Sequence, residues 1–402
     1  MTTTAESVVA TRARSGQPLR VGIVGLGARD DLWAVLAHLP ALRAVPGFEV
    51  TALSASSPES AARAGEIHGV ARTFGNATDL AACDEVDLVV VSVRVPKHRE
   101  LVSAALQAGK AVFCEWPLGN GLAETEELAR LAGEHDVPTI VGLQIRANPV
   151  MNYLRDLVAD GYVGEVLSTT VIGSAGGVWG AYSDPNSRYL LDPANGATLL
   201  TVPFSHTLDG LAWVLGEPQR LQIEHAVRRH KVTDAETGQP LVMTSPDQVV
   251  ASGRLTDGAV ATLHFRGGHF PGTNFHWEIN GTEGDIVVTA PIGHIQLAPL
   301  TLLGARGDAA ELAVLPVPES YRKVASLDWP ANDGALEVAD FYRQGAFGVA
   351  HLYQQFLEDL REGGNSVPDF SDAAVRHRSI HNASSMPTVD RVAPTRRSSE
   401  QR

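Results

Sequence analysis

The chain has 402 residues, of which 44% are hydrophobic, and its formal net charge is −14 at pH 7. This length accommodates two or three packed domains. The negative charge argues against non-specific binding to nucleic acid, because phosphates require basic surfaces. No segment approaches the run of about 18 apolar residues that a membrane-spanning helix needs. The two cysteines, Cys83 and Cys114, are too few for a disulfide framework, so we expect reduced core thiols and a cytoplasmic protein.

The two ends of the chain are polar. Residues 1–18 are rich in Thr, Ala and Ser and lack the apolar segment of a signal peptide, so they are predicted to form a disordered leader. Residues 391–402 are predicted to form a flexible tail.

A short apolar run, Val21–Val24, precedes the glycine pair Gly25-Leu26-Gly27 and a predicted helix over residues 31–42. Glycines at this point let the chain turn tightly and let a pyrophosphate approach the backbone at a helix N-terminus. The third position of the dinucleotide fingerprint is Asp30 rather than Gly or Ala. The pair therefore indicates either dinucleotide binding or merely tight packing.

Further apolar strands are predicted at residues 48–53, 87–93, 111–114 and 139–143, with helices ending at His68 and covering residues 100–108 and 122–135. This alternation predicts a doubly wound parallel sheet, which we assign to a dinucleotide-binding Rossmann domain over residues 19–145. Ligands of such sheets gather at the carboxyl ends of the strands. The candidate cofactor-binding residues are Gly25, Leu26, Gly27, Arg29, Asp30, Ser54, Ser56, Val93, Arg94, Pro96, His98, Glu115, Trp116 and Gln144.

The end of the second strand bears on the choice between NAD and NADP. No acid follows this strand before Glu59, whereas NAD-selective sites usually place an Asp or Glu near this point. Small hydroxyl residues with Arg29 or Arg63 nearby can receive a 2′-phosphate. The same serines can equally cap the following helix, so the preference stays open.

The pattern of predicted elements changes after residue 148, where most strands follow one another without an intervening helix. Strands are predicted at residues 165–172, 221–226, 248–255, 259–264, 276–279 and 285–288, with hairpin turns at Asp257-Gly258 and Asn280-Gly281. Helices are predicted at residues 150–160, 197–215, 338–360 and 372–385. We expect an α+β domain over residues 146–390, with a large, mostly antiparallel sheet and C-terminal helices that can pack back on the first domain.

The segment from Val89 to Leu118, V-V-V-S-V-R-V-P-K-H-R-E-L-V-S-A-A-L-Q-A-G-K-A-V-F-C-E-W-P-L, resembles the signature of the Gfo/Idh/MocA oxidoreductases, named for glucose–fructose oxidoreductase and inositol dehydrogenase. The resemblance extends over roughly residues 20–290. It implies a Rossmann domain joined to an antiparallel substrate domain, an NAD or NADP cofactor, a carbohydrate-like substrate, and a homodimer or homotetramer.

Two positions depart from that family pattern. Trp116 stands where the family usually has a catalytic lysine, and Val202 stands where it usually has an Asp four residues before the catalytic histidine; His206 is retained. Trp116, the stretch N-G-x-x-L-x-T and the following F-x-H-T-x-D resemble the branch of the fungal galactose-pathway repressor. That resemblance implies an NAD(P)-binding sugar-pathway sensor.

The remaining polar residues permit proton transfer next to a nicotinamide. His206 has an ordinary pKa of about 6.5 and is the predicted acid–base group. Tyr182 or Tyr189 can replace the missing lysine only where its pKa, ordinarily about 10, is lowered. Trp116 offers either a stacking face for a sugar ring or plain core packing. The candidate substrate-binding residues are Trp116, Arg146, Trp179, Tyr182, Arg188, Tyr189, Asn195 and His206.

Arg146, together with Arg94, Lys97, Arg188 and His264, can surround an anionic substituent, or each can be a surface charge. No metal site is expected, because the 14 histidines show no supported ligand spacing. Three functions stay open: an NAD(P)-dependent oxidoreductase acting on a sugar, polyol or sugar derivative; a non-catalytic NAD(P)-binding sensor; and a glycosidase that works by transient oxidation of the sugar.

Overall fold

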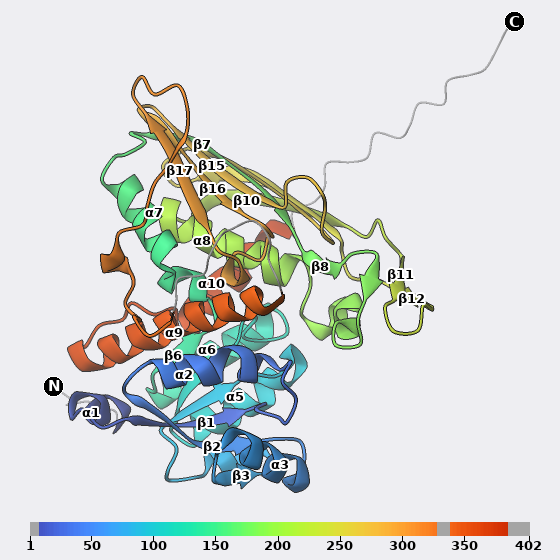
Figure 1. Cartoon of the computed structure of the whole chain (residues 1–402), viewed down its shortest axis with the longest axis vertical. Coiled ribbons are helices and arrows are strands. Elements are labelled where there is room, and N and C mark those ends of the chain that lie inside the picture. Colours follow the sequence, from blue (N-terminus) through green and yellow to red (C-terminus); the bar gives the residue numbers. More distant parts are fainter. Residues whose placement is uncertain (1–7, 328–337, 385–402) are drawn as a thin grey trace, which may run out of the picture.

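The computed structural model describes residues 8–327 and 338–384, and Figure 1 shows its two sheets with a long helix between them. The first sheet has the strand order β3-β2-β1-β4-β5-β6, and every pair in it is parallel. Its strands are β1 (Leu19–Val24), β2 (Phe48–Ser54), β3 (Arg72–Phe74), β4 (Leu88–Val91), β5 (Ala111–Cys114) and β6 (Thr139–Val141). This is the doubly wound order of a Rossmann sheet, as the alternating pattern predicts.

The sequence pattern misses the edge strand β3 and the short helix α4 (Ala77–Ala81). β3 has only three residues, none of them fully buried, and so lacks the apolar run that marks the central strands. The other helices of this half are α3 (Pro58–His68), α5 (His98–Gln107) and α6 (Leu122–His135), near their predicted positions. Short 3₁₀ turns, η2 (Val95–Lys97) and η3 (Gln144–Ala147), follow β4 and β6.

The helix after the glycine turn begins later than predicted. A π-helical turn, η1 (Ala34–His38), precedes α2 (Leu39–Ala44). Residues 28–32 therefore form a longer loop between the glycines and the helix. Single π-helical turns are rare and occur often at functional sites.

The prediction of a disordered leader through residue 18 is wrong for its described part. Residues 8–14 form helix α1 (Val8–Arg14), and Val9, Ala10 and Ala13 are buried. These three apolar residues lie on one face of the helix, which packs against the long helix α9 (Val338–Glu362). Residues 1–7 and the predicted tail 391–402 lie outside the described residues.

The second sheet has eight strands in the order β10-β13-β14-β7-β15-β16-β17-β18. Only the pair of β14 and β7 is parallel, so the sheet is mostly antiparallel, as predicted. One face packs on α7 (Pro149–Ala159) and α8 (Ser205–Leu215), which lie on the side toward the first domain (Figure 1). The strands are β7 (Val166–Ser174), β10 (Pro218–Ala226), β13 (Gln248–Leu255), β14 (Val260–Arg266), β15 (Phe275–Gly281), β16 (Gly284–Ala290), β17 (Thr301–Arg306) and β18 (Ala313–Val314).

A small lobe projects beside this sheet (Figure 1). It contains β8 (Gly176–Trp179) and a three-stranded sheet of β9 (Tyr182–Ser183), β11 (Lys231–Asp234) and β12 (Pro240–Val242). After β9 the chain passes through the 3₁₀ turns η4 (Arg188–Leu191) and η5 (Pro193–Asn195) and the π-helical turn η6 (Leu200–Phe204) into α8. The predicted helix over 197–215 therefore contains a π-helical turn followed by an α-helix. The remaining 3₁₀ turns are η7 (Ile295–Leu297) and η8 (Glu319–Tyr321).

The two C-terminal helices join the two halves of the molecule. α9 lies between the sheets in Figure 1, and its residues Val349, Leu352 and Phe356 belong to the apolar core that covers one face of the Rossmann sheet. α10 (Phe370–Ser384) places Phe370 in the core on the opposite face and Ile380 in the core of the second domain. Both helices thus bury apolar surface against elements far away in the sequence.

Within the described residues, no helix is both long and apolar enough to cross a membrane. Cys114 is buried and Cys83 is partly buried, and both are free thiols.

Candidate functional site

The glycine turn at the carboxyl end of β1 is tightly packed against neighbouring parts of the chain. Gly25 has a φ of 98°, and a Cβ atom there would lie 2.2 Å from the backbone oxygen of Ser92. At Gly27 a Cβ atom would lie 2.7 Å from the side chain of Leu32, and Leu26 is buried. Only glycine fits position 25 without strain, and it makes the tight turn that the first glycine of a dinucleotide fingerprint makes.

The loop after the glycines is tied to the second domain. Arg29 donates from Nε and Nη2 to the carboxylate of Asp31, at 2.8 and 2.5 Å, and from Nη2 to Asn186 Oδ1 at 2.6 Å. Asn186 Nδ2 in turn donates to Asp31 Oδ2 at 2.6 Å. The hydrogen bonds from Arg29 hold the pKa of Asp31 below its ordinary value. Asp30 is exposed beside this cluster.

The serines after β2 have mixed environments. Ser54 is buried and its carbonyl accepts a hydrogen bond from Gly25 N at 3.1 Å. Ser56 is exposed, and Ser57 caps α3 by accepting from Ser60 N at 3.2 Å. The sequence offers these serines either as ligands of a 2′-phosphate or as helix caps, and Ser57 acts as a helix cap. Arg29, a predicted partner of a 2′-phosphate, is paired with Asp31 instead.

Among the predicted cofactor-binding residues that follow β4, His98 is buried, and the other three are more accessible to solvent. Val93 is half-buried, whereas Arg94 and Pro96 are exposed. His98 is buried, and its Nδ1 and Nε2 lie 2.9 Å from the carbonyl oxygens of Pro117 and Val93. Burial lowers the pKa of His98. His98 therefore ties the loops after β4 and β5 together, and its ring nitrogens face backbone groups.

Glu115, which follows β5, belongs to a largely buried hydrogen-bonded chain that no pattern in the sequence indicates. Glu115 Oε1 lies 2.8 Å from His38 Nε2, and His38 Nδ1 lies 2.8 Å from the hydroxyl of Tyr353 on α9. Burial, and then the charge of Glu115, raise the pKa of Tyr353 well above its ordinary value. A phenol that stays protonated can donate to His38 Nδ1, which leaves Nε2–H to donate to Glu115.

Trp116 is a core residue in this structure. It is 6% exposed, its indole Nε1 donates to the carbonyl of Thr201 at 2.6 Å, and its ring lies 4.6 Å from that of His377 on α10. The alternative of core packing therefore describes its contacts. Thr201 is the neighbour of Val202, so the two departures from the family pattern lie next to each other in space.

His206, on α8, is buried, and its Nδ1 has no hydrogen-bond partner among the described residues. Burial lowers the pKa of His206 to about 4, although the negative charges of Asp209 and Glu115 oppose this shift. The imidazole is therefore neutral at pH 7. Asp209 stands one helical turn away, and no hydrogen bond joins its carboxylate to His206: it instead accepts hydrogen bonds from Arg146 and Arg376.

A second histidine, His294, lies near His206 and was not predicted as a site residue. Burial, followed by the charge of His206, lowers the pKa of His294 to about 4. Its Nε2 has no partner among the described residues, and its ring stacks on Trp179 with 6.4 Å between centroids. The Trp179 indole donates to the carbonyl of Leu190 at 3.0 Å and is 3% exposed. His294 follows β16 at a distance from any recognisable motif, so no sequence signal points to it.

Three buried glutamine side chains extend the same region. The Oε1 atoms of Gln144, Gln296 and Gln344 all lack hydrogen-bond partners among the described residues. Their elements η3, η7 and α9 pack against one another, and a Cβ at Gly348 on α9 would lie 3.3 Å from Gln144 Cγ. Buried polar atoms are nearly always hydrogen-bonded, so this group of unpaired atoms, with those of His206 and His294, is suited to a polar ligand.

Neither predicted tyrosine suits the role of proton relay. Tyr189 lacks the lowered pKa that this role requires, and Tyr182 is exposed on the small lobe. Tyr189 lies with its ring 4.5 Å from the guanidinium carbon of Arg94, but burial raises its pKa. Its predicted role required a lowered pKa. Tyr182 is 65% exposed on β9, at the edge of the small lobe. Asn195 donates from Nδ2 to the carbonyl of Tyr189 at 2.8 Å and thereby stabilises the local turn.

Two of the predicted anion-binding arginines, Arg146 and Arg188, have carboxylate partners within the protein. Arg146 donates to both oxygens of Asp209, at 2.9 and 2.7 Å, and to Asp372 at 2.9 Å, and these carboxylates raise its pKa against the effect of burial. Arg188 pairs with Asp234 at 2.7 Å and with Glu236 at 3.2 Å. Both guanidinium groups are therefore engaged by carboxylates of the chain itself.

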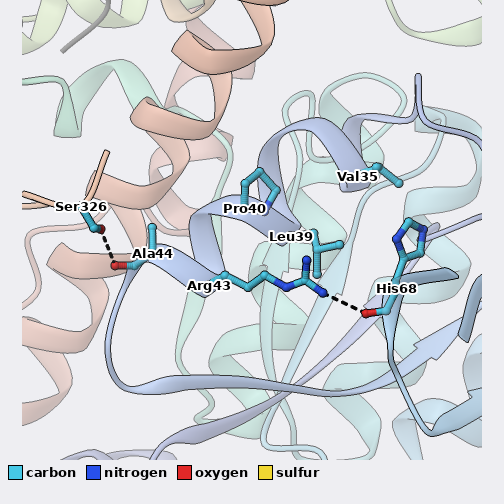
Figure 2. A pocket seen from close by; sticks show the side chains of 7 residues that line it. All are labelled: Val35, Leu39, Pro40, Arg43, Ala44, His68 and Ser326. Atoms are coloured by element: carbon cyan, nitrogen blue, oxygen red, sulfur yellow. Dashed lines mark hydrogen bonds between the residues drawn. The ribbon is translucent and has the colours of Figure 1, made fainter. Parts of the chain in front are cut away.

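A groove of about 560 Å³ lies on the outer surface of η1 and α2 (Figure 2). Val35, Leu39 and Arg43 line it, with His68 at its edge. His68 Nε2 lies 2.8 Å from the carbonyl of Gly27, so this groove borders the glycine loop from outside. His206, His294 and the glutamines are not among the residues that line it.

Within residues 8–327 and 338–384, no group of three or more His, Cys, Asp or Glu side chains is arranged to hold a metal ion.

The comparisons with known proteins agree with this architecture. Residues 19–143 match the family described as "Oxidoreductase family, NAD-binding Rossmann fold", and residues 149–290 match "Gal80p, C-terminal domain". The dehydrogenase aclE of Aspergillus oryzae is 33% identical over 296 residues, which cover 71% of this chain and 80% of that protein. The 1,5-anhydro-D-fructose reductase of Ensifer adhaerens is 27% identical, over 72% of this chain and 81% of its own length.

The galactose/lactose metabolism regulatory protein GAL80 of Saccharomyces cerevisiae is 27% identical over 380 residues, which cover 88% of this chain and 85% of that protein. The crystal structure of a super-repressor mutant of the same protein superposes with a TM-score of 0.76 at 24% identity, over 91% of this chain and 95% of that one. The chain therefore belongs to the Gfo/Idh/MocA family of NAD-binding oxidoreductases, in the branch whose C-terminal domain is like that of Gal80p.

Proposed function

We propose that this protein is an NAD(P)-dependent oxidoreductase that acts on a sugar, a polyol or a sugar derivative, with His206 as the group that accepts the hydroxyl proton. The observation that carries the proposal is the neutral, buried His206, whose unpaired Nδ1 lies in a region of further unpaired polar atoms. The dehydrogenase and reductase relatives support the enzymatic reading, and the reductase relative supports a sugar-like substrate.

The cofactor would be held by residues 19–145, and the substrate by residues 146–390. Gly25 makes the tight turn of a dinucleotide-binding loop, and the unpaired Ser92 Oγ and Gln144 Oε1 suit the polar groups of a dinucleotide. NAD(P), when bound, supplies the acceptor or donor for a hydride. No acid follows β2 before Glu59, and Arg29 is engaged with Asp31, so neither feature selects between NAD and NADP.

His206 has the properties of a general base in this setting. It is neutral at pH 7 because its pKa is about 4, so a ring nitrogen can accept the proton of a substrate hydroxyl. The imidazolium that forms is favoured by the negative charges of Asp209 and Glu115, which both act to raise its pKa. The pairing of Asp209 with Arg146 and Arg376 lowers the pKa of that carboxyl against the effect of burial and keeps it ionised.

A second candidate function is a non-catalytic NAD(P)-binding sensor. The contacts of Trp116 favour it: the indole that replaces the usual lysine is buried and donates to the backbone beside Val202, so this part of the site holds no ionisable side chain from either position. The similarity to GAL80 over most of the chain also favours this function.

Purified protein incubated with NAD⁺ or NADP⁺ and a panel of sugars, polyols, anhydro sugars and glycosides distinguishes these functions. The proposal predicts net formation of reduced cofactor with at least one sugar or polyol. Dinucleotide binding without turnover on the whole panel would favour the sensor. Release of the aglycone without net reduction would instead identify a glycosidase that oxidises its substrate transiently.

We also propose that the protein forms a homodimer or homotetramer through the outer face of its large sheet. On this face Val250, His264, Ile172, His276 and Thr289 are neighbours across five successive strands. Val250 is 46% exposed, and α7 and α8 pack on the opposite face. Sedimentation velocity would test this proposal, and a monomer at micromolar concentration would contradict it.

A further inference from the structure

Residues 184–201 of the second domain, which we term the strap, contact three loops at the carboxyl edge of the Rossmann sheet. Near its start, Asn186 binds the loop after the glycine turn. In its middle, Tyr189 packs under Arg94, and Ala194 O accepts from Asn120 Nδ2 at 2.9 Å. At its end, the carbonyl of Thr201 accepts from Trp116. The strap therefore spans the edge at which a Rossmann sheet binds its ligand.

The contact at the start of the strap is presented by a local turn. Asp184 Oδ1 accepts from the backbone N of Asn186 at 2.8 Å and of Ser187 at 3.1 Å, and its Oδ2 accepts from Ser187 Oγ at 2.6 Å. This turn directs the Asn186 amide to Arg29 and Asp31, which it contacts with its oxygen and nitrogen respectively. We term Arg29, Asp31 and Asn186 the clasp.

The two ends of the strap differ in burial. In the clasp, the side chains of Arg29 and Asp31 are 59% and 36% exposed, and Asn186 is exposed. At the other end, a Cβ on Gly196 would lie 2.9 Å from Val95, and Thr201 Oγ1 donates to the Gly196 carbonyl at 2.7 Å. Local opening is easiest where contacts are exposed and few, so it costs least at the clasp and most near the closely packed Gly196.

We propose that the strap is a gate for the dinucleotide and that the clasp sets the rate at which the gate opens. This inference rests on the proposed dinucleotide binding. A ligand that reaches from the glycine turn to the loop of Trp116 lies under the strap, and its release requires the strap to lift. Exposed hydrogen bonds of the clasp are individually weak, which suits a contact that must break at each exchange.

The test compares dissociation of NADH and NADPH from the full-length wild-type protein and from Asn186→Ala, by stopped-flow fluorescence with displacement by excess oxidised dinucleotide. We expect the variant to release the nucleotide about tenfold faster, since loss of contacts at an interface acts mostly on the dissociation rate. The control is Arg306→Ala, which removes an exposed pair with Glu283 on the large sheet of the second domain. This control should leave the rate unchanged.

A double-mutant cycle with Arg29→Ala separates a clasp from a direct contact between Arg29 and the nucleotide. If the two residues act through one clasp, the double variant releases the nucleotide no faster than either single variant. Equal dissociation rates in the wild-type protein and Asn186→Ala, or fully additive effects in the cycle, would overturn the gate. Failure of the wild-type protein to bind either dinucleotide would overturn the proposed function instead.

Discussion

At the scale of single residues, the two departures from the family pattern form one structural unit. The family resemblance implies a lysine at position 116 and an aspartate at position 202, and the Trp116 indole donates to the carbonyl of Thr201, the neighbour of Val202. A buried lysine would need a charge partner, whereas an indole needs one acceptor, which the backbone supplies. The proton-accepting role therefore falls to His206 in our proposal.

Replacement of His206 by alanine tests that role. We expect kcat to fall about 10²- to 10⁴-fold, the usual contribution of a general base, with little change in dinucleotide affinity. Because the pKa of His206 is about 4, kcat/KM of the wild-type protein should stay level from pH 7 to about pH 5 and fall as the pH approaches 4. His135→Ala, at the exposed C-terminal end of α6, is the control and should keep its turnover. Full activity of His206→Ala would exclude this residue as the base.

Trp116→Phe tests the structural account of the indole. The substitution leaves the Thr201 carbonyl without its donor, and a buried unpaired acceptor costs about 1–3 kcal/mol. We expect the free energy of unfolding, measured in urea, to fall by that amount. Trp213→Phe removes a longer indole bond, 3.2 Å to Asn152 in a half-buried setting, and should cost less. Equal losses in the two variants would contradict the account.

At the scale of elements, α10 connects the two halves through one buried arginine. The Arg376 side chain is fully buried; its Nε donates to Asp209 at 3.2 Å, and Nη2 and Nη1 donate to Glu217 at 2.7 and 3.2 Å. Arg146 approaches the same Asp209 from η3. This network fixes α8, and hence His206, relative to the end of the Rossmann sheet.

Two arginines on α10 provide a matched comparison. Arg376→Ala leaves Asp209 with one of its two arginine partners, and removing one member of a buried ion pair costs about 3–5 kcal/mol. Arg378, two residues later, forms an exposed pair with Glu126 at 2.6 Å, and its removal should cost less than about 1 kcal/mol. Urea unfolding of both variants measures the difference. Similar stability of the two variants would show that the network is not needed to hold α8.

At the scale of the whole molecule, four buried histidines share one electrostatic property. Burial lowers the pKa values of His206, His294, His351 and His377 to about 4 each, from the ordinary 6.5. They lie on α8, beside η7, on α9 and on α10, where the two halves of the molecule meet. The unfolded chain therefore binds more protons than the folded protein between about pH 6.5 and pH 4.

This difference predicts a stability that is full above about pH 6.5 and is lost as the pH falls toward 4. Each pKa unit corresponds to about 1.4 kcal/mol, so several kcal/mol are at stake over this range. Urea unfolding at a series of pH values measures the slope, and His351→Gln should make it shallower. A free energy of unfolding that is constant from pH 7 to pH 4.5 would contradict the prediction.

Local patterns in the sequence determined the Rossmann strands, the glycine turn, the antiparallel half and the position of His206, because each depends on periodicity or on a short motif. The sequence patterns did not predict the edge strand β3, because its three residues are not fully buried. They also did not predict helix α1, because its apolar face is short.

Only the tertiary structure decided which side chains are partners. Arg146 and Asp209 are 63 residues apart in sequence, and His38 and Tyr353 are 315 apart. The same holds for Trp116, whose acceptor is 85 residues away, and for Asn186, which meets Arg29 across 157 residues. Such contacts depend on how helices and sheets pack, and no periodicity within one segment records that packing. For this reason the sequence pointed to a family and a cofactor, whereas the roles of Trp116, Arg146 and the strap emerged only from the folded chain.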